Sequence, residues 1–167
     1  LNPAYPVPTN ITWTLDLTNA VFPETAVVGR IHGSGFACER TTIQGGTLSL
    51  RQGTTWPPDL GITVLLNWRP GEKLSGRTIE ITPAHPRPPR VVLRWKDEQQ
   101  QPITENINSG YALKLTFGEA ANGRMPGRIY LCLPDADKSF VAGTFDAEIR
   151  KPSPPKRPPP RPPKPRT

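Results

Sequence analysis

The stretch Thr41-Thr-Ile-Gln-Gly-Gly-Thr-Leu-Ser-Leu50 decides the fold class of this chain. Gly45-Gly46 separates two short runs of β-branched and aliphatic residues, which is the pattern of two antiparallel strands joined by a two-residue turn. Similar runs lie on both sides of this stretch, and glycine or proline recurs between them. The sequence therefore predicts an all-β fold.

About ten strands are predicted between residues 10 and 150. Their ranges are 10–17, 26–31, 38–44, 47–51, 62–68, 78–82, 91–95, 112–117, 128–133 and 140–149. No segment keeps a helical period for more than about two turns. The pattern favours one antiparallel β-sandwich domain over residues 10–150, similar to a jelly roll, with an extended leader at 1–9.

The first predicted strand alternates cleanly between apolar and polar residues. Its apolar side is formed by Ile11, Trp13, Leu15 and Leu17. Because three prolines precede it within residues 1–9, this strand follows an extended leader and can pair with its own sheet or with that of a neighbouring molecule. In the second case Trp13 is a partner-binding residue.

The net charge of +7 is concentrated at the C-terminus. Residues 151–167 hold six basic residues, nine prolines and no acid, whereas residues 1–150 hold 15 basic and 14 acidic residues. Nine prolines in this arm exclude helix and sheet and favour an extended polyproline II conformation. A near-neutral body also lacks the basic face of a nucleic-acid-binding protein, so nucleic acid is not expected as a partner.

Three interpretations of this basic arm stay open. It is a disordered tail or linker, an extended segment that lies on an acidic surface or an anionic wall polymer, or a ligand for a proline-recognition domain. If the arm lies on such a surface, the residues that contact the partner are Arg157, Arg161, Lys164 and Arg166.

Two cysteines, Cys38 and Cys132, fall in predicted strands. In an exported protein they would form one disulfide that closes a long loop, and two buried thiols are the alternative. The chain contains no CxxC motif, which argues against redox catalysis.

Groups that could carry catalysis are few. His32 lies in a glycine-rich turn and His85 in a proline-rich patch, and no serine stands in a nucleophile motif. Asp135 and Asp137 have the spacing of calcium ligands but are better explained as a turn. The histidines and cysteines lack the short spacings of a zinc site, so we expect no catalytic residue, metal or cofactor.

Trp56 offers an alternative function. It lies in a loop beside two prolines, where an exposed indole can stack on a sugar ring, with Trp68 as a second contact. The other interpretation of Trp56 is a lid folded onto the core.

The segment 125–147, with 46–53 and 111–118, resembles uncharacterised β-rich domains of exported bacterial proteins. The resemblance implies export and a sandwich fold, and it implies no activity. A chain that begins at Leu1 also suits a mature protein after signal removal. No apolar run is long enough for a transmembrane helix.

The leading hypothesis is therefore a non-enzymatic structural or accessory subunit of a larger extracytoplasmic assembly, periplasmic, secreted or on the cell surface. Its partners would be other protein subunits of a complex or filament. Its N-terminal segment and basic arm would make the contacts, and carbohydrate binding through Trp56 is the alternative function.

Overall fold

The computed structural model describes residues 5–53, 58–66 and 75–150, and these form an all-β protein with one single-turn 3-10 helix, η1 (Leu17–Asn19). The first six strands are β1 (Val28–Ile31), β2 (Ser34–Ala37), β3 (Arg40–Gln44), β4 (Thr47–Gln52), β5 (Leu60–Leu65) and β6 (Thr78–Ile81). The other five are β7 (Arg90–Lys96), β8 (Pro102–Ile107), β9 (Ala112–Phe117), β10 (Arg124–Cys132) and β11 (Phe140–Arg150).

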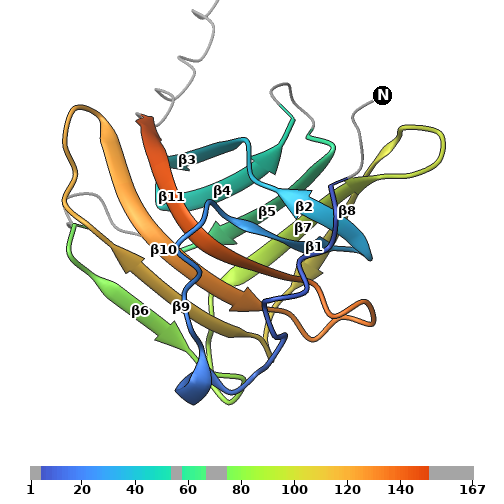
Figure 1. Ribbon diagram of the computed structural model, residues 1–167, viewed down its shortest axis with the longest axis horizontal. Coiled ribbons are helices and arrows are strands. Elements are labelled where there is room, and N and C mark those ends of the chain that lie inside the picture. Colours follow the sequence, from blue (N-terminus) through green and yellow to red (C-terminus); the bar gives the residue numbers. More distant parts are fainter. Residues whose placement is uncertain (1–4, 54–57, 67–74, 151–167) are drawn as a thin grey trace, which may run out of the picture.

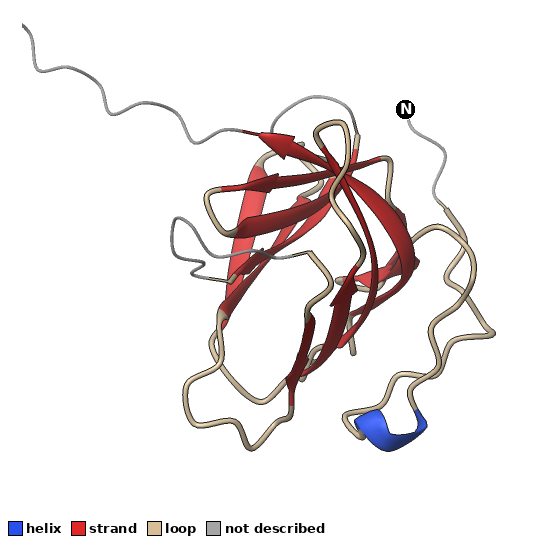
Figure 2. Ribbon diagram, turned by 90° about the vertical axis from the view of Figure 1, so that its left-hand side faces the viewer, coloured by secondary structure: helices blue, strands red, loops and turns tan. Residues whose placement is uncertain are grey.

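The strands form one curled, mixed sheet with the shape of a half-barrel (Figures 1 and 2). Along it the order is β6-β9-β10-β11-β3-β4-β5-β7-β8, and the β1–β2 hairpin branches from β11. The predicted sandwich of separate antiparallel sheets is not confirmed. The long strand β11 keeps the two halves in one sheet, because it pairs antiparallel with β10 and parallel with β3.

Most predicted strands are present, and β9 has the predicted bounds. The turn at Gly45-Gly46 is confirmed, since both glycines have positive φ and Gln44 pairs with Thr47. The strands β2 and β8 were not predicted, because β2 lacks β-branched residues and β8 is an edge strand that begins with a proline. The residues predicted as a strand at 10–17 form no strand.

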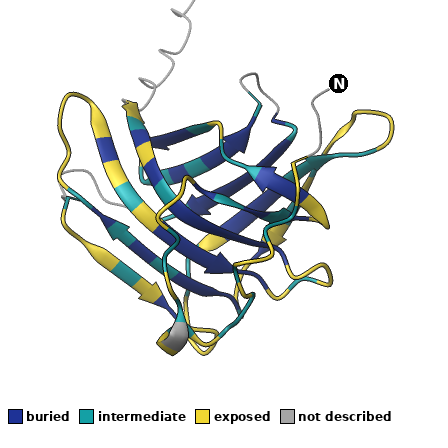
Figure 3. Ribbon diagram, viewed as in Figure 1, coloured by how far each residue is buried: buried dark blue, intermediate teal, exposed yellow. Residues whose placement is uncertain are grey.

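The main core lies on the concave side of the curled sheet and is formed by alternate residues of its strands. Figure 3 shows the buried positions along the strands. Fully buried side chains from several strands meet there, among them Leu50, Ile62, Leu93, Leu115 and Leu131. The β1–β2 hairpin adds Ile31 and Phe36 to the same cluster.

Residues 10–22, which we call the strap, cover part of the convex face of the sheet. Their apolar residues pack on a second cluster made by Tyr130, Cys132, Phe140 and Ala142. The indole N–H of Trp13 donates to the carbonyl of Leu133 at 3.0 Å, and the hydroxyl of Tyr130 donates to the carbonyl of Thr12. The alternating residues therefore belong to an extended segment that packs on its own sheet through its side chains. They do not form a strand that pairs through its backbone.

The contact between Tyr130 and the strap predicts a loss of stability at alkaline pH. Burial raises the pKa of Tyr130 to about 12, above its ordinary value near 10. The folded state therefore holds this proton more tightly, its stabilisation is complete below pH 10, and it declines as the pH rises toward 12.

We expect the free energy of unfolding to fall over this window by at most about 1.4 kcal/mol per pH unit for this group. Urea unfolding at pH 9, 10 and 11 measures the slope. Tyr130→Phe should flatten it, and an unchanged slope in that variant would contradict the assignment.

Candidate functional site: a cleft at the fork of the sheet

The sheet forks at β11, because this strand changes its partner along its length. Phe140–Ala142 pair with β1, Ala26 forms a bridge with Thr144, and Glu148–Arg150 pair with β3. Among the described residues no strand pairs with residues 145–147 on this side. The two branches separate there and leave a cleft of about 210 Å³, which we call the fork cleft.

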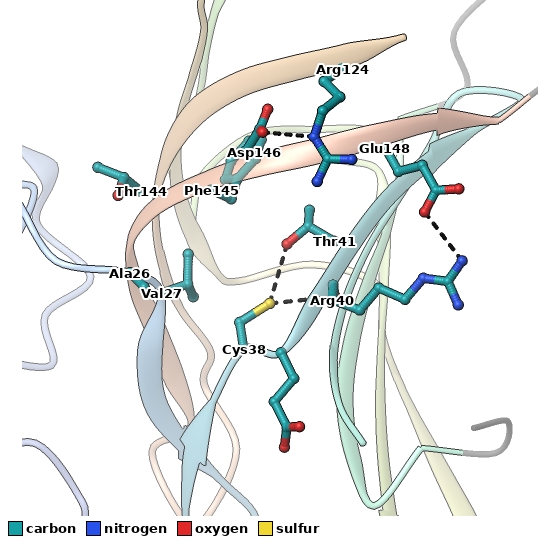
Figure 4. A pocket seen from close by; sticks show the side chains of 11 residues that line it. Ala26, Val27, Cys38, Arg40, Thr41, Arg124, Thr144, Phe145, Asp146 and Glu148 are labelled. Carbon is teal, nitrogen blue, oxygen red and sulfur yellow. Dashed lines mark hydrogen bonds and ion pairs between the residues drawn. The ribbon is translucent and has the colours of Figure 1, made fainter. Parts of the chain in front are cut away.

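Two ion pairs line the fork cleft (Figure 4). Arg40 on β3 contacts Glu148 on β11 at 3.2 Å, and the Nε of Arg124 on β10 donates to Asp146 at 2.7 Å. The side chain of Arg124 is about half exposed, and the hydrogen bond to Asp146 raises its pKa. Both arginines are therefore held in place while part of each side chain faces the solvent.

Cys38 lies at the base of the cleft as a thiol. Its sulfur is 3.2 Å from the hydroxyl of Thr41 and 3.4 Å from the carbonyl of Arg40. Burial raises the pKa of this thiol, which disfavours the nucleophilic thiolate. No histidine is among the described residues that line the cleft.

Cys38 and Cys132 are both free, so the structure contains no disulfide between them. Cys38 packs against the concave core, whereas Cys132 belongs to the convex cluster under the strap, where its sulfur is 3.5 Å from the amide of Thr14. The thiols lie on opposite faces of the sheet, and both are free: that of Cys132 is buried and that of Cys38 is partly buried.

Further cations stand close to the fork cleft. Arg51 on β4 is directly opposite Arg40, is only 8% exposed, and has its pKa lowered by burial and then by the charges of Arg40 and Arg150. Arg150 is the last described residue of β11 and lies opposite Gln44. Positive charge thus gathers where β11 ends, and the basic arm begins at the next residue.

The turns at His32 and at Asp135–Asp137 interact with each other and lie apart from this cleft. His32 stacks on Trp95 with ring centroids 4.1 Å apart, and its Nδ1 is 3.2 Å from Asp137. Asp135 accepts the amide and the hydroxyl of the buried Ser139, so its carboxylate completes a turn, as predicted. His32 has a positive φ of 48° at this tight hairpin, which its contacts hold in place.

The structure places the predicted site residues unevenly. Trp13 is described and contacts its own sheet. Trp56, Trp68, Arg157, Arg161, Lys164 and Arg166 lie outside the described residues. Four residues of the cleft carry no signal in the sequence, because arginine–carboxylate pairs joined across strands leave no local motif: Arg40, Arg124, Asp146 and Glu148.

Comparison of the chain with protein-family models, with curated proteins and with solved structures found no match. Within the described residues no helix is long and apolar enough to cross a membrane. The fork cleft and its charges are therefore the basis for a functional proposal.

Proposed function

We propose that this protein is a non-enzymatic accessory subunit that docks on an acidic protein partner in an extracytoplasmic assembly. One observation carries the proposal: Arg40, Arg51 and Arg150 gather at the end of β11, where an arm with six further cations and no acid begins. Residues 1–150 are close to neutral, so most of the net positive charge of the chain lies in the arm that follows β11.

Such a distribution suits association with an acidic surface. Complementary charges accelerate the encounter of two proteins and orient them, and the effect weakens as salt screens it. A proline-rich arm also loses less conformational entropy on binding than a flexible arm of equal length. The arm would therefore capture the partner, and the folded sheet beside Arg150 would complete the contact.

A binding role also agrees with the chemistry of the fork cleft. The thiol of Cys38 has a raised pKa, and the carboxylates of Asp146 and Glu148 are engaged by arginines. Catalysis by these groups would need an activated nucleophile or a free general base. The described side chains instead form a fixed set of donors and acceptors, which suits recognition.

Removal of the basic arm tests the proposal. A chain that ends at Arg150 should keep its far-UV circular dichroism spectrum and its melting temperature, because β11 is complete at that residue. Its association with the partner that copurifies under native conditions should weaken at least tenfold at low salt, and the difference should shrink at high salt.

Replacing the six cations of the arm by glutamine, with all prolines kept, separates charge from stiffness. The subunit proposal requires a native particle larger than the monomer. A monomeric native particle, or unchanged assembly without the arm, would refute it.

A further inference from the structure

The strap is held on the sheet through side chains. Within the described part of the chain, no hydrogen bond joins a backbone group of residues 10–22 to a backbone group of the sheet. The hydrogen bonds at Thr12, Trp13 and Thr14 each involve one side chain, and the remaining attachment is apolar packing on the second cluster. Figure 2 shows the strap as an extended trace along the outside of the sheet, with η1 in blue. The strap can therefore separate from the sheet without breaking a strand ladder.

The surface beneath the strap is formed by strands that come much later in the sequence. The hydrogen-bond partners Tyr130, Cys132 and Leu133 lie 118 to 120 positions after the strap residues that they contact. On β9, the ammonium of Lys114 lies 5.6 Å from the ring centre of Phe22. Every contact of this kind is between distant parts of the chain, so a second copy of the protein offers the strap an identical surface.

Residues 23–26, which we call the connector, join the strap to the sheet. The connector bends at Glu24 and Thr25, and both residues are exposed. Its far end is fixed, because the carbonyl of Thr25 accepts the amide of Thr144 at 2.8 Å. Pro23 at its near end has no amide donor and a restricted φ, which favours an extended chain. A change of backbone angles at the exposed bend would thus redirect the strap and leave β1 in place.

The strap also packs incompletely on the sheet. A hollow of about 360 Å³ lies between residues 10–12 and Val21–Pro23, with Tyr130 among its lining residues. The side chain of Val21 is 76% exposed. Incomplete packing and the lack of backbone pairing place a segment at the low end of local stability, where opening is easiest.

We infer that two copies of this chain exchange residues 5–22 by opening the connector, so that the strap of each copy covers the convex cluster of the other. Residues 5–9 move with the strap, and the bridge between Tyr5 and Gly35 re-forms on the second copy. The exchanged dimer keeps every contact of the monomer except those of the connector. It therefore differs from the backbone pairing with a neighbouring sheet that the sequence suggested. The inference is independent of the acidic partner proposed above.

Folding gives each strap the opportunity to meet a second copy. The strap has no surface to bind until β10 and β11 have joined the sheet, which is slow because the intervening loops are long. The short connector gives the strap's own sheet an effective concentration of about 1 mM. Exchange should therefore compete with closure as the chain concentration approaches that value. Because return to the monomer requires all strap contacts to break, the dimer should persist on dilution.

Refolding of the full chain from urea at two concentrations tests the inference. At about 10 µM the product should be monomeric, and at about 1 mM about half should be a dimer, as measured by size-exclusion chromatography with light scattering. Refolding a mixture of isotopically labelled and unlabelled chains then identifies the contact. Isotope-filtered NMR spectra of the mixed dimer should show the Trp13 indole of one copy close to Tyr130 or Leu133 of the other.

Two changes of connector length provide a matched pair of variants. Deletion of Glu24 shortens the connector, which strains the closed monomer and leaves the extended connector of the dimer unstrained. This variant should form the dimer at a concentration at least tenfold lower than the wild type does. Insertion of two glycines after Glu24 relaxes the connector, and this variant should stay monomeric at the concentration where the wild type is half dimeric.

Three results would each overturn the exchange. These are a wild type that refolds only to monomer at about 1 mM, a dimer without contacts between Trp13 and the other copy, and equal dimer fractions at all three connector lengths. If the chain without Glu24 does not fold, the refolding of the wild type decides by itself. None of these results bears on the docking function proposed for the basic arm.

Discussion

Trp13→Ala should be among the most destabilising substitutions in this chain, with a loss of about 3 kcal/mol in the free energy of unfolding. The indole packs on the convex cluster and donates to Leu133, and the ammonium of Lys138 lies 5.2 Å from its ring centre. Truncation removes the packing and leaves the Leu133 carbonyl without this donor. Urea unfolding, monitored by far-UV circular dichroism, measures the loss.

Val21→Ala is the matched control for this substitution. Val21 belongs to the same strap but is 76% exposed, so its truncation should change the free energy of unfolding by less than about 0.5 kcal/mol. Similar small losses in both variants would mean that the strap does not stabilise the sheet. They would also reopen the prediction that Trp13 binds a neighbouring molecule.

Gly29→Ala should destabilise the protein by about 3 kcal/mol or more. A Cβ atom at Gly29 would lie 1.9 Å from the carbonyl oxygen of Phe140 and 2.9 Å from the Cα of Val141. These are backbone atoms of the adjacent strand, so no side-chain rotation relieves the clash. The β1–β11 pairing would have to separate at Gly29 and Val141, and the melting temperature should fall by about 6–12 °C.

Gly45→Ala distinguishes this steric effect from the general cost of replacing a glycine. Gly45 has a positive φ of 57°, but a Cβ atom there would meet nothing within 4 Å. The expected loss is about 1 kcal/mol, which reflects the left-handed backbone conformation alone. Equal losses at the two glycines would contradict the close approach of β1 to β11.

The sequence was sufficient to predict the all-β class and most strands. Local signals explain this success: β-branched runs formed strands, and Gly45-Gly46 formed the two-residue turn. The alternation of residues 10–17 correctly indicated one buried side. It could not distinguish a paired strand from a strap, because both present alternate side chains to the same face.

The arrangement of the sheet and the fork cleft could not be predicted from local patterns. The parallel pairing of Glu148 with Thr42 joins residues more than 100 positions apart. The cleft depends on this pairing, since it brings Arg40 to Glu148. Among the described residues, 145–147 of β11 then have β10 on one side and no strand on the side of the cleft. Neither the partner of a strand nor the point where it changes partner is encoded by its own hydrophobic period.

The position of β11 has a consequence for how the protein folds. The last of the described strands occupies an interior place in the sheet, between β10 on one side and both β1 and β3 on the other. During synthesis, β3, β4 and β5 would have an uncovered edge until the ribosome had released residue 150. Long loops must close before this strand can join, so folding should be slow. Until then the open edge of β3 would be the surface that a chaperone has to protect.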